Sequence, residues 1–252
     1  MKVNVEAAGG VMTVTITRPE VRNAVDSETA SALSEAFETF EKSDSLAVAV
    51  LAGAGGNFCA GFDLKAIAID SAIQLSEIGN GPMGPTRMLL SKPVVAAIEG
   101  YAVAGGLELA LWCDLRVAAS NATFGVFNRR FGVPLIDLGT IRLPRMIGQG
   151  RALELILTGR AVAADEALRI GLVERLAEPG RALAEAQNLA REIAAFPPGA
   201  MRADRMSVLN QWSLTLDEAA KAEFQGGADV MASGESHQGA RRFVEGSGRH
   251  GG

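Results

Sequence analysis

The stretch GYAVAGGLELALWCD (residues 100–114) decides the fold. It follows directly on VVAAIEG (94–100), a continuous apolar run of the kind found in strands that are buried on both faces. Gly105-Gly106 allows a sharp turn, and LELALW supplies good helix formers, so a helix is expected to begin near Gly106. The free N–H groups and the positive dipole end of that helix would lie at the terminus of the strand.

The same succession of strand, glycine turn and helix occurs earlier in the chain. LAVAVLAG (46–53) reads as a buried strand, and GAGGNFCAGFDLK (53–65) follows it, with a short helix expected from Phe62. This turn fits neither glycine pattern that binds nucleotides. A dinucleotide fingerprint would need glycine at position 58, where phenylalanine stands, and no GK[ST] follows for a phosphate loop.

The remaining pattern predicts an α/β body followed by helices. Alternating residues around Met12 and Ile16 and the run DLRVAAS (114–120) predict further strands, and Asp26 or Ser27 is expected to cap a helix. Strands that alternate with helices favour parallel pairing with helical crossovers. After about residue 139 the strand signal fades, and helices are expected over 139–158, 163–171, 181–196, 199–211, 217–232 and 235–245.

Breaks in the chain suggest how it is organised. Pro197-Pro198-Gly199 is the clearest break and predicts a body over 1–196 and a helical appendix over 197–252. The end, SGRHGG (247–252), is expected to fray. GNGPMGP (79–85) has the composition of a mobile surface loop, which is either a cover for a binding site or an ordinary connector.

Composition excludes several classes of function. The chain has 252 residues, of which 48% are apolar and 21% charged, with a formal net charge of -5. This is a globular composition without the basic footprint of a nucleic-acid binder. No apolar run approaches the roughly 20 residues that span a bilayer, and MKVNVEAAGG does not resemble a signal peptide. A cytoplasmic protein without membrane or nucleic-acid partners is therefore expected.

Histidine and cysteine are scarce. The two histidines, His237 and His250, lie in the last sixteen residues, which disfavours a Ser-His-Asp triad or a His-rich metal site in the body. Cys59 and Cys113 stand among apolar residues and are expected to be packed free thiols. No metal is expected, so the chemistry must depend on carboxylates, backbone donors and the substrate's own reactivity.

Glu108 is the first candidate for that chemistry. It lies in the expected first turn of a helix, between Leu107 and the apolar residues 109–112. A carboxylate in such surroundings is costly unless it is paired or used. The alternative is a surface carboxylate that complements the helix dipole. If N–H groups of the two glycine turns converge on one oxygen, they would stabilise an enolate or oxyanion.

Several stretches taken together resemble the crotonase superfamily, also called the enoyl-CoA hydratase/isomerase family. They are TRPEVRNAVD, NFCAGFDLK, KPVVAAIEGYAVAGGLELALWCDLRVAAS, FGV and LTGRAVAADEALRIGLVERL. The resemblance spans nearly the whole chain. It implies an α/β crotonase-like spiral of ββα turns, with a helical C-terminal part that packs as a homotrimer or dimer of trimers. It also implies acyl-CoA thioester substrates and no cofactor beyond the coenzyme A of the substrate.

The resemblance also implies roles for individual residues. The backbone N–H groups of Phe62 and Gly105 match the family's oxyanion hole, which holds the thioester oxygen as an enolate forms. The residues that match the parts gripping coenzyme A are Arg22, Ala24, Ala60, Asp63, Leu64 and Lys65. The cations considered as partners for its phosphates are Arg18, Arg22, Lys65 and Lys92.

The chain departs from the family's hydratases at one important position. These enzymes use two glutamates that share a water molecule, and Glu108 matches the first. Asn128 stands where the second is expected, and an amide can bind water but cannot transfer its proton. Asp137 lies close to the sequence position at which dienoyl-CoA isomerases and a dehalogenase of the family have a catalytic aspartate. The alternative is that Asp137 caps the next helix. If Arg129-Arg130 points inward, it would favour an acidic acyl group or pair with Asp137.

The sequence therefore predicts an enoyl-CoA hydratase in which Glu108 is the acid/base. An enoyl-CoA or dienoyl-CoA double-bond isomerase that uses Glu108 or Asp137 is the second hypothesis. A non-catalytic acyl-CoA-binding homologue is the third. Apolar residues considered for the acyl pocket are Met83, Met88, Leu89, Phe124, Phe127 and Phe131.

Overall fold

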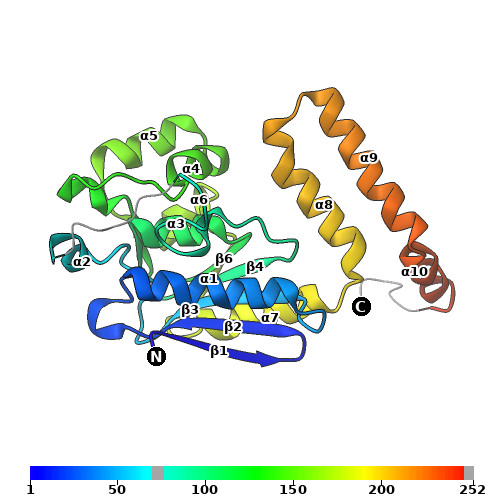
Figure 1. Cartoon of the computed structure of the whole chain (residues 1–252), viewed down its shortest axis with the longest axis horizontal. Helices are drawn as coiled ribbons and strands as arrows, with labels where there is room; N and C mark the ends of the chain where they lie inside the picture. The colour runs from blue at the N-terminus through cyan, green and yellow to red at the C-terminus, as the bar shows by residue number, and fades with distance from the viewer. Residues whose placement is uncertain (70–76, 247–252) are drawn as a thin grey trace. The chain divides into compact units, whose positions relative to one another are not determined.

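Strand β3 (Val48–Gly53) is formed by the run LAVAVLAG and lies near the centre of the main sheet in the computed structural model (Figure 1). The structure describes residues 1–69 and 77–246. The sheet has the strand order β1-β2-β3-β4-β6-β9, and only β1 and β2 pair antiparallel. The predicted parallel strands are thus confirmed. The other strands of this sheet are β1 (Val3–Ala8), β2 (Val11–Ile16), β4 (Val94–Ile98), β6 (Leu115–Ala119) and β9 (Arg175–Ala177).

Helices cover both faces of the main sheet. Successive side chains of a strand point to opposite faces, so neighbouring residues of β2 contact different helices. Met12 of β2 belongs to the main apolar core together with Phe37 of α1 (Ser27–Lys42), which runs alongside β1 and β2 in Figure 1. Thr13 faces the other way, and its hydroxyl accepts a hydrogen bond of 3.0 Å from Gln187 of α7 (Ala182–Ala194). Two covered faces explain why β3 and β4 are continuously apolar.

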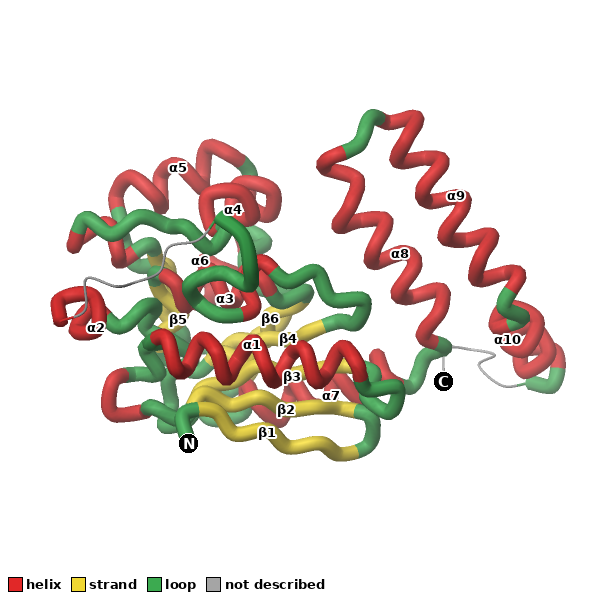
Figure 2. The backbone as a smooth tube through the Cα atoms, in the orientation of Figure 1, coloured by secondary structure: helices red, strands yellow, loops and turns green. Residues whose placement is uncertain are grey.

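A second, smaller sheet consists of β5 (Tyr101–Val103), β7 (Thr123–Gly125) and β8 (Val162–Ala163), of which β5 is labelled in Figure 2. The consecutive strands β4 and β5 are divided between the two sheets, and α3 (Gly105–Trp112) follows them. The next pair, β6 and β7, is divided in the same way. This repeat is the ββα spiral that the sequence predicted.

The predicted helices are confirmed with changes at their ends. The helix expected over 139–158 is two helices, because Gly148 (φ 84°, ψ 150°) ends the first and begins the second. Asp26 caps α1, as predicted, by accepting a hydrogen bond from the Thr29 N–H. The strands after residue 139 were missed. The remaining helices are α2 (Leu64–Ile69), α4 (Gly139–Ile147), α5 (Gln149–Thr158), α6 (Ala164–Arg169), α8 (Pro198–Asn210), α9 (Leu216–Ala232) and α10 (Glu235–Val244), with short 3-10 turns at Pro19–Val21, Pro85–Arg87, Phe127–Phe131 and Gln211–Ser213.

The chain divides into two compact units, Met1–Arg191 and Glu192–Gly252. The boundary predicted between residues 196 and 197 lies five residues further along. In the second unit α8 packs against α9, and α9 against α10. The predicted frayed end SGRHGG lies outside the described residues. No helix in the described part of the chain is long and apolar enough to cross a membrane.

Arg116 of β6 connects the end of α3 to the sheet, and its side chain is only 1% exposed. Its guanidinium donates to the carbonyl oxygens of Ala110 (3.2 Å) and Cys113 (2.8 Å) at the end of α3, and to that of Leu172 (2.9 Å). It also forms an ion pair with Glu174. Because the last carbonyls of a helix lack partners within it, Arg116 satisfies groups that would otherwise be buried and unpaired.

We expect Arg116→Met to lower the free energy of unfolding by on the order of 3 kcal/mol, because it leaves buried carbonyls without donors. Arg169→Met is the control, since it breaks an exposed ion pair with Asp165 and should change stability by less than about 0.5 kcal/mol. Urea unfolding of both variants measures the difference. Equal losses would contradict the assigned role of Arg116.

Candidate active site

The two glycine turns predicted from the sequence lie against each other. The Cys59 N–H donates to the Tyr101 carbonyl at 2.9 Å, and the Val103 N–H donates to the Cys59 carbonyl at 3.1 Å. A Cβ atom built on Gly61 would lie only 2.9 Å from the backbone nitrogen of Gly105. This close approach requires glycine at position 61 and brings the Phe62 and Gly105 peptides to one place.

Both peptides offer a free donor. Among the described residues, neither the Phe62 N–H nor the Gly105 N–H has a protein acceptor, and Gly105 is the first residue of α3. Ala104 precedes it with φ 54° and ψ -127°, a conformation that costs a non-glycine residue on the order of 1–3 kcal/mol. Two unpaired N–H groups on adjacent turns are the arrangement that stabilises an oxyanion.

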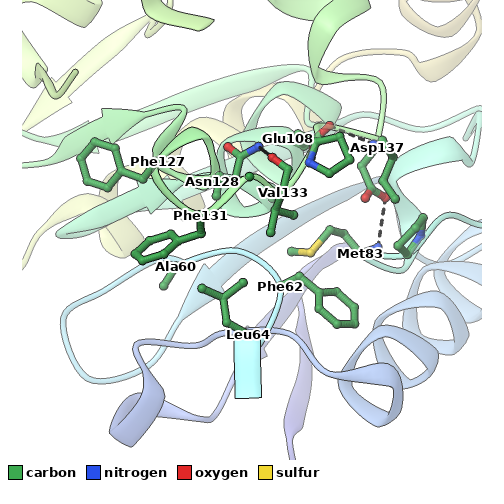
Figure 3. Close-up of a pocket in the computed structure, with 16 residues that line it drawn as sticks. Ala60, Phe62, Leu64, Met83, Glu108, Phe127, Asn128, Phe131, Val133 and Asp137 are labelled. Carbon is green, nitrogen blue, oxygen red and sulfur yellow. Dashed lines mark hydrogen bonds between the residues drawn. The ribbon is translucent and has the colours of Figure 1, made fainter. Parts of the chain in front are cut away.

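A cavity of about 300 Å³ lies beside these turns (Figure 3). Its polar side chains are Glu108, Asn128 and Asp137, and the part of its wall that the structure describes contains no lysine or arginine. The other lining residues are apolar or glycine: Ala60, Phe62, Leu64, Pro82, Met83, Ala104, Gly105, Phe127, Phe131, Gly132, Val133, Pro134 and Ile136. The predicted oxyanion-hole residues and all three predicted catalytic residues therefore share one cavity.

Glu108 is buried in α3, with 3% of the residue exposed, so the alternative of a surface carboxylate is wrong. Its Oε1 accepts hydrogen bonds from the backbone N–H groups of Asp137 and Gly139, each at 2.9 Å. Both bonds use the same oxygen, which leaves Oε2 for a water molecule or a substrate. A Cβ on Gly139 would lie 2.8 Å from that Oε1, so a larger residue at position 139 would displace the carboxylate.

The surroundings of Glu108 suit acid–base chemistry near neutral pH. The pKa of Glu108 is raised to about 7: burial is the largest cause and the nearby charge of Asp137 adds to the rise, while the hydrogen bonds from Gly139 and Asp137 and the charge of Arg142 oppose it. A carboxyl group with a pKa near the working pH can both accept and return a proton.

Asp137 is also buried, with 2% of the residue exposed. Its Oδ1 accepts hydrogen bonds from the Met83 N–H at 3.0 Å and from the Thr86 hydroxyl (Figure 3 shows the first). Leu138, not Asp137, is the N-cap of α4, and no side chain caps this helix. The prediction that Asp137 caps the helix is therefore wrong. Burial raises the pKa of Asp137, and its hydrogen bonds oppose that rise.

Asn128 lies in the 3-10 turn Phe127–Phe131 and is 6% exposed. Its Nδ2 donates to the Val133 carbonyl at 2.7 Å, whereas its buried Oδ1 has no hydrogen-bond partner among the described residues (Figure 3). The alternative amide orientation would place two oxygens together. Asn128 thus offers an acceptor and no titratable group.

The two arginines that follow Asn128 do not line the cavity. Arg129 donates to the Ile156 carbonyl at 3.2 Å. The guanidinium of Arg130 lies 3.9 Å from the centre of the Phe127 ring and donates to the Gly159 carbonyl. The alternative that they point inward is wrong, because these contacts hold both side chains against the outer part of the fold.

The stretches predicted to grip coenzyme A lie side by side. The Ala60 N–H donates to the Arg22 carbonyl at 3.0 Å, and the Asp63 N–H donates to the Val25 carbonyl at 2.8 Å. Ala24 lies between Arg22 and Val25, while Ala60 and Leu64 also line the cavity. Their contact with coenzyme A stays a prediction.

Two of the four cations considered for its phosphates have structural roles instead. Arg18 forms ion pairs with Asp63 (3.0 Å) and Asp26 (3.3 Å). Lys92 is buried, and its Nζ donates to the carbonyl oxygen of Phe40 at 2.8 Å, near the end of α1. Arg22 and Lys65 are exposed.

Part of the segment 79–85 lines the cavity, which fits the expected cover for a binding site and not an ordinary connector. Pro82 and Met83 line the cavity, and Met83 is only 1% exposed. A Cβ on Gly105 would lie 2.7 Å from the Met83 sulfur, so this side chain covers the oxyanion-hole glycine. Of the predicted pocket residues Met83, Phe127 and Phe131 line the cavity, and Met88, Leu89 and Phe124 do not. The wall formed by Val133, Pro134 and Ile136 was missed, although the apolar run before Asp137 was a usable signal.

Comparison with known proteins agrees with this arrangement. The model of the enoyl-CoA hydratase/isomerase family matches residues 6–250. Enoyl-CoA hydratase EchA19 of Mycobacterium tuberculosis is 35% identical over 248 residues, which cover 96% of this chain and 92% of that protein. The (E)-benzylidenesuccinyl-CoA hydratase of Thauera aromatica is 37% identical over 211 residues, which cover 83% and 82%.

A solved structure is similar over the same length. The crystal structure of an enoyl-CoA hydratase from Mycobacterium tuberculosis H37Rv matches with a TM-score of 0.92 and 37% identity, over 97% of this chain and 96% of that one. The similarity to this family, in sequence and in structure, therefore extends over both compact units. The chain belongs to the enoyl-CoA hydratase/isomerase family.

Proposed function

We propose that this protein is an enoyl-CoA hydratase that converts a 2-enoyl-CoA thioester to the 3-hydroxyacyl-CoA. The observation that carries the proposal is the buried Glu108 carboxylate, which lies in the same cavity as the unpaired N–H groups of Phe62 and Gly105. These are an acid/base and an oxyanion hole, the two elements that addition of water next to a thioester requires.

The proposed steps use one proton carrier. Glu108 removes a proton from a water molecule while the water oxygen bonds to C3 of the acyl group and the C2–C3 double bond opens. The negative charge that develops on the thioester oxygen is stabilised by the Phe62 and Gly105 N–H groups. Glu108 then returns the proton to C2. Asn128 contributes only an acceptor, Oδ1, that can hold the water molecule.

A double-bond isomerase is the second candidate, and Asn128 favours it. Isomerisation moves a proton from one carbon to another and so needs only one well-placed base. Glu108 would serve as that base, with the same oxyanion hole.

We infer that the acyl group is apolar. The described wall of the cavity consists mostly of apolar side chains, including Phe127, Phe131 and Ile136, and its only ionisable groups are the carboxyls of Glu108 and Asp137. An acidic acyl group would meet like charge there without a cation to pair with.

We propose that coenzyme A is held by the neighbouring stretches around Arg22 and Ala60 and that the protein is a homotrimer or a dimer of trimers. Support for assembly comes from α8, α9 and α10, in which no residue is buried within the chain. Large apolar side chains exposed in this unit include Trp212, Leu216, Phe224 and Phe243. Exposed apolar residues in this number are typical of a subunit interface.

The first test is mass spectrometry of 2-hexenoyl-CoA incubated with the protein in heavy water. A product heavier by one molecule of heavy water indicates hydration, and carbon-bound deuterium without net addition indicates isomerisation. We expect hydration. Glu108→Gln keeps the shape of the side chain but cannot carry the proton, so its turnover should fall by about 10²–10⁴-fold.

The matched control is Glu154→Gln, which changes an exposed carboxylate of α5 that pairs with Arg160. Its turnover should equal that of the wild type. Turnover near the wild-type value in Glu108→Gln would remove Glu108 from the mechanism.

The raised pKa of Glu108 also predicts how stability depends on pH. A carboxyl whose pKa is about 7 when folded and 4.5 when unfolded binds its proton more tightly in the folded state. Its contribution to stability is therefore present below pH 4.5 and is lost as the pH rises through 7. Glu108→Gln keeps an acceptor for the Asp137 and Gly139 N–H groups but has no proton to lose. The free energy of unfolding of this variant, relative to that of the wild type, should therefore rise by about 2 kcal/mol from pH 5 to pH 8. Urea unfolding at both pH values checks this gain, and parallel pH curves for the two proteins would refute it.

The apolar cavity predicts selectivity against acidic substrates. We expect kcat/KM for a 2-enoyl-CoA with a terminal carboxylate to be at least about tenfold below that for the hydrocarbon analogue of equal length, because like charges placed together cost several kcal/mol. Steady-state kinetics with the two thioesters measures the ratio. A preference for the acid would contradict an apolar acyl site.

A further inference from the structure

Asp137 connects two parts of the site through two of its atoms. Its backbone N–H donates to Glu108 Oε1 at 2.9 Å. Its side-chain Oδ1 accepts from the Met83 N–H at 3.0 Å and from the hydroxyl of Thr86, which is fully buried. Asp137 therefore holds both the acid/base Glu108 and the segment that covers the oxyanion hole (residues 81–86, the covering segment).

The covering segment is built for this contact. Gly81 adopts φ 96°, and a Cβ there would lie 2.8 Å from Asp137 Oδ1 and 2.4 Å from the Thr86 hydroxyl oxygen. Only glycine allows the segment to approach the carboxylate so closely. The next residues place the Met83 sulfur where a Cβ on Gly105 would lie within 2.7 Å of it. The position of Met83 over the oxyanion hole thus depends on Asp137.

Charged groups from each neighbouring element face this pair of carboxyls. Arg142 of α4 donates to the Asp137 carbonyl at 3.3 Å, and its charge acts on both Glu108 and Asp137. The charge of Arg87, in the 3-10 turn Pro85–Arg87, acts on Asp137, and the nearby Cys113 thiol at the end of α3 is buried, which raises its pKa and keeps it uncharged. The two cations lower the pKa of Asp137 against the rise that burial causes, and the negative charge of Asp137 raises the pKa of Glu108.

We propose that Asp137 is a positioning residue and not a base: its carboxylate binds Met83 and Thr86 and so fixes Met83 over the oxyanion hole, and its N–H and charge set the orientation and charge environment of Glu108. Oδ1 already accepts two hydrogen bonds, as a group that holds a segment in place would, so only Oδ2 could take a proton, and the Asp137→Asn variant below tests that alternative. This inference rests on the proposed reaction at Glu108.

Two substitutions separate the two contributions of Asp137. Asp137→Asn keeps an acceptor for Met83 and Thr86 but removes the negative charge. We expect its kcat at pH 8 to stay within about tenfold of wild type, and the acidic limb of its kcat/KM profile to move to lower pH because the pKa of Glu108 falls. If Asp137 were the base, Asp137→Asn would lose as much turnover as Glu108→Gln, and that result would overturn the proposal.

Thr86→Val isolates the contact with the covering segment, since valine has the shape of threonine but lacks the hydroxyl. We expect kcat to fall at least about fivefold with no movement of the acidic limb, and Thr86→Ser, which keeps the hydroxyl, to recover most of the loss. Wild-type kcat in Thr86→Val would overturn the positioning role. Circular dichroism and thermal unfolding confirm that each variant is folded.

A measurement that does not depend on catalysis distinguishes a failure of this inference from a failure of the proposed function. The pKa of Glu108 is obtained from the pH dependence of unfolding in proteins with and without Glu108→Gln, in the wild-type and Asp137→Asn backgrounds. We expect a lower value in the Asp137→Asn background even if the wild type acts on no 2-enoyl-CoA. Equal values in the two backgrounds would overturn the inference while leaving the proposed hydratase reaction untouched.

Discussion

The pair of backbone hydrogen bonds to Glu108 Oε1 is the constraint on which the site depends. A carboxylate in an apolar helix needs partners, and here they come from Asp137 and Gly139, about one further turn of the spiral along the chain. They leave the other oxygen unused, and they oppose the burial that raises the pKa of Glu108 to about 7. The start of α4 must therefore approach α3 so closely that only glycine fits at position 139.

The division of successive strands between two sheets makes this approach feasible. β4 and β5 precede α3 and belong to different sheets, and the first glycine turn pairs with β5 through the hydrogen bonds of Cys59 with Tyr101 and Val103. The oxyanion hole is thus a product of backbone positions. Ala104 holds its unfavourable dihedral angles because the contacts on both sides determine them.

The parts of the site that the sequence could predict are those with a local cause. Glu108 was found because a buried strand, a glycine turn and an apolar helix are adjacent in the sequence, whereas the N–H groups of Phe62 and Gly105 were assigned from the family resemblance. Asp137 was assigned a cap or a catalytic role, but its actual partners, Met83 and Thr86, lie more than 50 residues earlier and leave no periodic signal. Arg18 and Lys92 were considered as partners for the coenzyme A phosphates because their actual partners, Asp63 and the Phe40 carbonyl, are distant in the sequence and are seen only in the structure.

The strands β8 and β9 show a second limit of prediction from the sequence. β8 and β9 have two and three residues, too few for an alternating pattern, and they form because neighbouring strands offer free edges. Helices with long amphipathic or apolar stretches were predicted correctly, and a single glycine, Gly148, decided whether one helix or two formed.

The predominantly parallel spiral has a consequence for how the chain reaches its native state. Parallel neighbours such as β3 and β4 are joined by long connections, so their pairing requires closure of large loops before any contact is gained. The oxyanion hole and the partners of Glu108 come from segments near residues 61, 105 and 137. A partly folded chain that contains only α1 and the first three strands would therefore have no site, and catalytic activity should appear among the last events of folding.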